Sequence, residues 1–407
     1  MFLQAACVAN LGDGIALLAL PWLASLLTRD AAQIAMVTAA LRLPWLLFSI
    51  PAGLMADRLD RRALMLWADA IRCCVLLLLV YLLSEVQGLD QLNTGEAQAL
   101  IWGLTAIAFV LGMAEVLRDN TAQTFLPALV SEKQLEKANG QLWSAEQLVG
   151  QFVGPPLAGW LILQSYGSPF LVNALCLALA WYWVFKIRLP ASTPSTSQGN
   201  IGQQIREAFG WLYGHAQMFR LAVMLGVLNF LTVGGLTILL LFSQDVLALS
   251  ATQHGFLLTA GALGGVVGGM LCPKIIERLG GTRSVHLALL LFGMPYLVIA
   301  LTDSVLLVAA ALFVEMFAAL LWNIVTVSLR QRSIPGPLLG RVNSVYRLIG
   351  WGMMPLGALA AGAVVELAQR TLPQEGALRL YYGLAWAVSL LLFLYGLFKL
   401  RIEPQTQ

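Results

Sequence analysis

The chain has 407 residues, of which 59% are hydrophobic and only 11% are charged, and its formal net charge is +3. So few charges cannot cover the surface of water-soluble domains, and so small a net charge cannot form the dense basic patch that nucleic-acid binding requires. Because 59% of 407 residues is roughly 240 and a membrane-spanning helix needs about 20, the composition admits about twelve spans. We therefore expect a polytopic membrane protein.

The apolar segments indicate helices and not the strands of a β-barrel. Runs such as 101–113 and 305–316 stay apolar on every face, whereas barrel strands alternate polar and apolar residues. The first segment lacks the basic start of a cleavable signal peptide, so we expect it to remain as the first span. The five cysteines fall in apolar segments and match neither a disulfide framework nor a metal site.

Twelve spans follow from the apolar runs in chain order. The spans predicted for the first half are Phe2–Leu27, Ile34–Met55, Leu64–Leu83, Ala97–Leu117, Gln141–Gln164 and Phe170–Phe185. Those predicted for the second half are Leu221–Phe242, His254–Leu271, Val285–Leu301, Val305–Leu329, Val342–Val365 and Leu380–Leu400. The predicted fold class is therefore an all-α membrane protein with twelve transmembrane helices in two six-helix bundles.

The basic residues predict which side of the membrane each loop faces, because cytoplasmic loops retain Lys and Arg. With the N-terminus inside, eighteen of the 24 Lys and Arg residues fall in or beside inner loops. Only Arg29, Arg370 and Arg379 fall in outer loops. An error of one span would scramble this separation, so we predict that both termini are cytoplasmic.

Three regions follow from this topology: an N-terminal six-helix bundle (1–187), a cytoplasmic linker (188–218) and a C-terminal six-helix bundle (219–407). The linker begins with a stretch rich in Pro, Ser, Thr and Gln, which is typical of flexible chain. Between Ile201 and Leu212, apolar residues then recur at helical spacing, which predicts a short amphipathic helix on the inner membrane surface. A solvated turn without lipid contact is the alternative.

The segment between predicted helices 2 and 3 carries a motif. Residues 53–62 have the sequence GLMADRLDRR. This segment resembles the loop signature G-x-L-a-D-R-x-G-R-R of the major facilitator superfamily, and Asp60 departs from it where Gly is usual. The motif positions that match are Gly53, Asp57, Arg58, Arg61 and Arg62. An inner loop that is basic only because of membrane topology is the alternative interpretation.

The motif residues have physical roles that suit a gate. A glycine at position 53 allows close packing of helix 2, and Asp57 is suited to capping a helix N-terminus. Arg61 is suited to bridging an acid such as Glu115 or Asp119. A degenerate second copy over residues 268–283 follows predicted helix 8, as the first copy follows helix 2.

Predicted helix 5 carries a second motif at Gly150, Gly154, Pro155 and Gly159. It is similar to the antiporter signature G-x-x-x-G-P-x-x-G-G of drug-exporting facilitators. Small residues four apart permit close helix contact, and proline removes an internal hydrogen bond so that the helix can bend. Packing of small residues without any meaning for the direction of transport is the alternative.

With Gly12 and Asp13 in the first helix and the sequence LGRV at 339–342, the chain is most similar to the enterobactin-exporter and macrolide-efflux branch of this superfamily. The resemblance covers nearly the whole chain. It implies that helices 1, 4, 7 and 10 line a central path.

Ionisable residues deep in the membrane are candidate functional groups, because each is costly there unless it is paired or hydrated. Counted at about 1.5 Å per residue, Asp13, Arg42 and Glu315 reach the midplane of helices 1, 2 and 10. An ion pair between Asp13 and Arg42 would keep that acid charged, whereas burial without a basic neighbour favours a protonated Glu315. We therefore predict Glu315, Asp13 and Arg42 as proton-coupling candidates, with a permanently protonated, purely structural Glu315 as the alternative.

Four further charged residues lie nearer the inner face and are expected to pair and hold helices together: Asp69, Arg72, Glu146 and Arg347. Candidates for lining a substrate cavity, at the depth of the midplane, are Asn10, Asn229, Trp322 and Asn323. Because tryptophan also favours membrane interfaces, Trp322 has a second interpretation as a membrane anchor.

The resemblance and the buried charges together predict a secondary active transporter in a bacterial inner membrane. We expect it to export a small amphipathic compound, such as a drug, macrolide or siderophore, in exchange for protons. Its partners are then a small-molecule substrate, protons and the lipid bilayer, with no cofactor and no metal. A proton-coupled importer or a lipid flippase of the same fold is the alternative. An intramembrane enzyme is more remote, because the three histidines share no helix face and no hydrolase motif is present.

Overall fold

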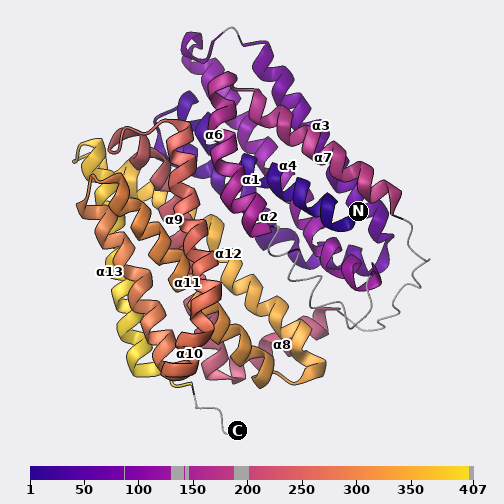
Figure 1. Cartoon of the computed structure of the whole chain (residues 1–407), viewed down its shortest axis with the longest axis vertical. Coiled ribbons are helices and arrows are strands. Elements are labelled where there is room, and N and C mark those ends of the chain that lie inside the picture. The colour runs from indigo at the N-terminus through magenta and orange to yellow at the C-terminus, as the bar shows by residue number, and fades with distance from the viewer. Residues whose placement is uncertain (87, 130–141, 143–145, 188–200, 403–407) are drawn as a thin grey trace. The chain divides into compact units, whose positions relative to one another are not determined.

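The structure is a computed structural model that describes residues 1–86, 88–129, 142, 146–187 and 201–402. All regular secondary structure in these residues is helical (Figure 1). The chain divides into two compact units. The first unit comprises Met1–Ser197 with Leu249–Thr259, and the second comprises Gln198–Ala248 with Ala260–Gln407.

The first unit is built from long apolar helices. Its elements are α1 (Phe2–Leu27), α2 (Ala31–Arg58), α3 (Arg61–Ser84), the 3₁₀ helix η1 (Leu89–Gln91), α4 (Thr94–Leu129), the π-helix η2 (Glu146–Val153), α6 (Gly154–Gln164) and α7 (Ser168–Lys186). Helix α2 packs mainly on α4, and α7 packs on both α1 and α3. Helix α1 also contacts η2 and α6, so these helices surround a common interior.

The second unit repeats this construction after a short leading helix. Its elements are α8 (Ile201–Gly214), α9 (Ala216–Asp245), α10 (Ala251–Leu301), α11 (Val305–Ser333), α12 (Gly336–Ala368) and α13 (Gln374–Lys399). Helix α8 occupies the segment expected to be amphipathic. It buries Ala208 and Leu212 and exposes Arg206 and Glu207.

Ten helices of the described residues are long and apolar enough to span a bilayer. One of them, α10, contains two spans, because Gly280 interrupts its 51 residues with φ 74° and ψ 166°. This left-handed conformation favours glycine. The stretch from η2 through α6 forms a further span between α4 and α7. Counted over the described parts of the chain, these helices confirm the predicted fold of twelve spans in two bundles.

The fourth helix differs from its prediction in length, and the fifth differs in geometry. The fourth helix continues to Leu129 instead of ending at Leu117, and Arg118, the first charged residue beyond Leu117, finds its partner Asp69 on α3. The described part of the fifth span begins as a π-helix at Glu146 and becomes α-helical only at Gly154. The two prolines that follow Gly154 lack N–H groups and cannot continue the α-helical hydrogen bonds of the preceding turn.

Candidate functional site

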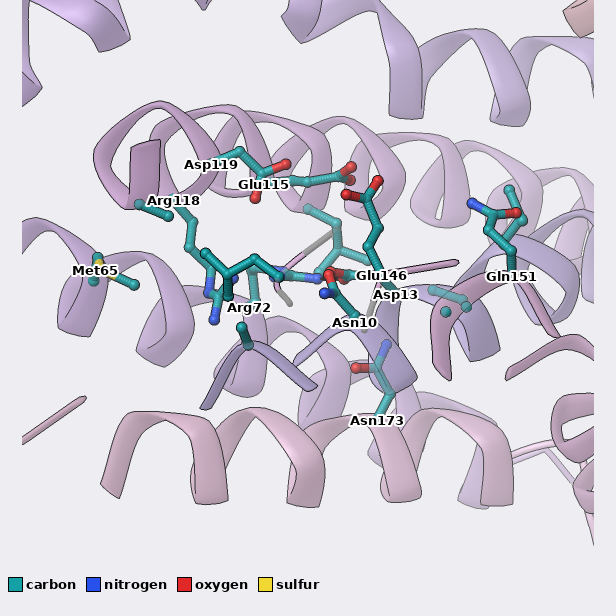
Figure 2. Close-up of a pocket in the computed structure, with 18 of the residues that line it drawn as sticks. Asn10, Asp13, Met65, Arg72, Glu115, Arg118, Asp119, Glu146, Gln151 and Asn173 are labelled. Carbon is teal, nitrogen blue, oxygen red and sulfur yellow. Dashed lines mark hydrogen bonds and ion pairs between the residues drawn. The ribbon is translucent and has the colours of Figure 1, made fainter. Parts of the chain in front are cut away.

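A cavity of about 370 Å³ lies inside the first unit, among α1, α2, α3, α4, η2 and α7 (Figure 2). Its walls include apolar side chains such as Phe2, Leu41 and Leu111. The charged residues that line it are Asp13, Arg42, Arg72, Glu115, Arg118, Asp119 and Glu146. Small-molecule sites have this size, and a few fixed polar groups among apolar walls give them specificity.

Asp13 of α1 forms an ion pair with Arg72 of α3, whose Nη2 donates to the carboxylate Oδ1. The Arg72 side chain is 4% exposed and that of Asp13 is 28% exposed, so the arginine is buried and the carboxylate borders the cavity. The expected pair between Asp13 and Arg42 is therefore wrong. Equal depth along two helices does not determine which way each residue points around its helix axis.

Arg42 of α2 instead lies beside an acid of α4. Its Nη1 is 3.7 Å from Oε1 of Glu115, and both side chains are partly exposed to the cavity. This distance is too long for a hydrogen bond, so the contact is a loose ion pair. Asp13 and Arg42 do line the same cavity, although each has a different partner.

A second ion pair joins α3 to α4 at the cavity wall. Arg118 Nε donates to Asp69 Oδ1 over 2.7 Å, and the Asp69 side chain is completely buried. Charges removed from water in this way need each other, because loss of one leaves the other unpaired in a poorly polarisable interior. Asp69 thus joins α3 to α4 through Arg118, and Arg72 joins α3 to α1 through Asp13.

Two carboxylates of the cavity, on Asp119 and Glu146, have no Lys or Arg side chain within 4 Å among the described residues. Both interact unfavourably with the nearby charge of Glu115, and Asp119 interacts favourably with Arg118 and Arg72 from beyond 4 Å. The sequence offered Asp119 only as a partner for Arg61, and Glu146 only as a structural residue. The sequence feature that could have indicated this site is the presence of three acids, Glu115, Asp119 and Glu146, in or beside two consecutive helices.

The polar candidate Asn10 and one glycine of the helix-5 motif, Gly150, both line this cavity. Gly150 and Gly154 allow very close contact with α1. A Cβ atom on Gly14 would lie 2.0 Å from the Gly150 carbonyl oxygen, and one on Gly154 would lie 2.6 Å from the Gly14 Cα. No side chain fits at these distances.

The other half of the motif packs against the start of α10, whose first residues belong to the same unit. A Cβ atom on Gly159 would lie 2.4 Å from the carbonyl oxygen of Ala251. One on Gly255 would lie 2.5 Å from that of Pro155. Close packing accounts for all four motif positions, and a role in the direction of transport stays a prediction.

A hydroxyl group compensates for the prolines of this helix. Because Pro156 has no N–H, the carbonyl of Phe152 lacks its α-helical donor, and Thr259 Oγ1 donates to that oxygen over 3.2 Å. Polar groups of this kind stabilise bent helices inside membrane proteins.

The loop motif organises the ends of three helices. Arg61 Nε donates to the Ala56 carbonyl at the end of α2, and Arg62 donates to the carbonyls of Val184 and Phe185 at the end of α7. Arginine is suited to this position, because the carbonyls at a helix C-terminus lack donors and carry partial negative charge.

Asp60, the departure from the family signature, is the N-cap of α3. Its carboxylate accepts from the Ala63 N–H over 2.6 Å. The expected close packing at Gly53 is wrong within the described residues, since no atom of theirs lies within 4 Å of a Cβ placed there. The side chains of Asp57 and Arg58 lie outside the described part of the structure, so their gating role stays a prediction.

Glu315 of α11 is the one charged side chain of the second unit that is buried among the described residues. It accepts hydrogen bonds from Tyr296 Oη over 2.8 Å and from Thr232 Oγ1 over 3.1 Å. Among the described residues no basic group lies within 4 Å of it. The sequence indicated the missing basic neighbour but not the hydroxyl partners, which come from α10 and α9.

Three further polar candidates belong to the second unit, and none of them lines the cavity of the first. Asn229 Nδ2 donates to the Gly350 carbonyl over 2.9 Å and so joins α9 to α12. Trp322 is only 2% exposed and packs inside the unit, which argues against a membrane anchor, whereas Asn323 is exposed.

Comparison with known proteins decides the family. The profile of the Major Facilitator Superfamily matches residues 2–358. The chain belongs to the major facilitator superfamily. It is therefore a multi-pass membrane transporter of small molecules, and not an enzyme.

Individual facilitators resemble this chain over most of its length. The multidrug efflux pump Tap of Mycolicibacterium fortuitum is 26% identical over 386 residues, which are 90% of this chain and 89% of that protein. The staphyloferrin A transporter of Staphylococcus aureus is 22% identical over 366 residues, which are 88% and 87% of the two chains. A crystal structure of a mutant nucleoside transporter NupG matches with a TM-score of 0.75 at 15% identity, over 98% of this chain and 100% of that one, and so shows the shared fold.

Proposed function

We propose that this facilitator is a secondary active exporter of a bacterial inner membrane. It moves an amphipathic organic compound outward in exchange for protons, by alternating access, with both termini in the cytoplasm. The similarity to proteins named as a multidrug efflux pump and a siderophore transporter supports the export of organic compounds. The distribution of basic residues supports the orientation.

The observation that carries proton coupling is the environment of Glu315. Among the described residues its carboxyl group contacts only hydroxyl donors, so it can gain or lose a proton without leaving a cation unpaired. A group that binds and releases a proton in every transport cycle needs this freedom.

Export is tested in everted membrane vesicles with dyes, macrolides and siderophores as candidate substrates. Acidification of the vesicle interior should drive accumulation of a substrate by the wild type. Glu315→Gln should abolish this accumulation, while Glu366→Gln, which alters an exposed acid of α12, should leave it unchanged. Accumulation driven by an alkaline interior would contradict export.

Orientation is tested with single cysteines in a variant whose five native cysteines are replaced. A cysteine at exposed Leu372 should react with a membrane-impermeant thiol reagent in intact cells, and one at exposed Arg206 should not. Labelling of position 206 from outside would reverse the proposed orientation.

A further inference from the structure

The charges around the cavity of the first unit do not balance. Each of its three arginines already faces a carboxylate, two of them in close ion pairs. Asp119 and Glu146 remain, and among the described residues no Lys or Arg side chain lies within 4 Å of either. Among the described residues that line it, the cavity therefore holds four carboxylates and three arginines.

The surplus carboxylates share one space. Figure 2 shows the side chains of Glu115 and Asp119, from α4, on the same side of the cavity as Glu146, from η2. Like charges in a confined, partly apolar space repel one another unless a cation neutralises them. Arg72 and Arg118 attract Asp119 only from beyond 4 Å, so a proton or a bound cation has to neutralise the remaining charge.

A second observation also indicates a ligand. Asn173 of α7 lines the cavity and is 1% exposed, yet its side-chain oxygen Oδ1 has no hydrogen-bond partner among the described residues. Buried amides in native proteins are almost always hydrogen-bonded, and an exception calls for a bound molecule or water. Asn173 lies across the cavity from the carboxylates of α4 (Figure 2).

We propose that this cavity binds an amphipathic organic cation, with Asp119 and Glu146 as counter-ions and Asn173 as a hydrogen-bonding partner. The apolar side chains Phe2, Leu41 and Leu111 provide the wall for the apolar part of the molecule. This inference rests on the proposed function, since it names the charge class of the exported compound. An anionic compound would meet Asp119 and Glu146 as like charges, and each arginine of the cavity already faces a carboxylate of the protein, Arg42 only loosely.

A site for cations is distinguished from a site for anions with two ions of nearly equal size and opposite charge, tetraphenylphosphonium and tetraphenylborate. Binding is measured by equilibrium dialysis on the purified full-length protein at constant pH without any gradient, and corrected for protein-free micelles. The wild type should bind tetraphenylphosphonium in preference to tetraphenylborate.

Substitutions locate the site. Asp119→Asn and Glu146→Gln should each weaken tetraphenylphosphonium binding at least about tenfold, the usual scale for loss of a charged partner. Asp119→Glu retains the charge and should retain binding, which separates a local effect from misfolding. The control Glu85→Gln alters an exposed acid of the same unit outside the cavity and should change nothing.

Preferential binding of tetraphenylborate, binding of neither ion, or undiminished binding in the Asp119→Asn, Glu146→Gln double variant would each overturn the cation site. The assay contains no proton gradient, so its failure differs from failure of the proposed export. A protein that exports a neutral compound against a gradient but binds no cation would keep the proposed function and lose this inference.

Discussion

Around the cavity of the first unit, seven charged side chains line one space, whereas the second unit buries a single acid, Glu315, among hydroxyl groups of the described residues. In the two close pairs of the first unit a buried arginine contacts a carboxylate, so loss of that carboxylate's charge would strand the arginine. Glu315 has no such constraint. The contrast suggests that the first unit holds the substrate and the second exchanges the proton.

The buried pair of the first unit is expected to show the largest effect on stability. Arg118→Met leaves Asp69 charged and fully buried, which should lower the free energy of unfolding by about 3–5 kcal/mol. Thermal and denaturant unfolding of the purified protein in detergent measures this change. Arg341→Met, which breaks a half-exposed pair with Glu207 in the second unit, should cost about 1 kcal/mol or less. Equal losses of unfolding free energy in the two variants would contradict the burial assigned to the two ion pairs.

Asp13→Asn tests whether the cavity and the proton site are separate. It leaves Arg72 buried without a charged partner, so both gradient-driven accumulation and substrate exchange should fall at least about tenfold. A second substitution, Arg72→Gln, should restore thermal stability to the Asp13→Asn protein. Exchange at the wild-type rate in folded Asp13→Asn protein would remove Asp13 from the cavity's function.

The two units share one packing device even though their charges differ. A Cβ on Gly14 would lie 2.0 Å from the Gly150 carbonyl oxygen, and one on Gly357 would lie 2.1 Å from that of Phe230. Gly14→Ala and Gly357→Ala should each cost about 1–3 kcal/mol of unfolding free energy. Gly103→Ala, with no described atom within 4 Å, should stay within about 1 kcal/mol of the wild type. A larger loss at Gly103 than at Gly14 would show that the helix contacts are misplaced.

The turn between α2 and α3 and the turn inside α10 differ in chemistry, and their substitution should have the smallest effects. Asp60 caps α3 in the first unit, so Asp60→Ala should cost about 1 kcal/mol and Asp60→Gly only a few tenths. Gly280 supplies a left-handed turn in the second unit, so Gly280→Ala should cost about 1–2 kcal/mol through backbone strain. Unfolding measurements on the three variants check this order, and a harmless Gly280→Ala would refute it.

The sequence predicted the fold well, because the number of spans depends on composition. Helix-length apolar runs and the separation of basic residues suffice for twelve spans. The extension of α4 to Leu129 and the π-helix before Pro155 were not predicted. Both depend on tertiary partners and local backbone geometry, which hydropathy does not record.

The candidate site was predicted in part. Depth counting placed Asp13 and Arg42 at the midplane as proton-coupling candidates, and both line the cavity. It paired them with each other because depth contains no information about rotation around a helix axis. The partners of Glu315 were missed for the same reason, since Tyr296 and Thr232 approach from other helices. Contacts between residues of one helical turn can be predicted from sequence, whereas contacts between residues of different helices depend on how the helices pack.

The most direct test of separate binding and coupling sites counts protons and substrate molecules together in proteoliposomes. A transported compound from the vesicle screen is used with wild type, Glu315→Gln and Asp119→Asn. Glu315→Gln should exchange labelled for unlabelled substrate near the wild-type rate and move no protons with it, whereas Asp119→Asn should lower exchange and proton movement together. Proton-coupled uphill transport by folded Glu315→Gln would contradict the assignment of coupling to the second unit.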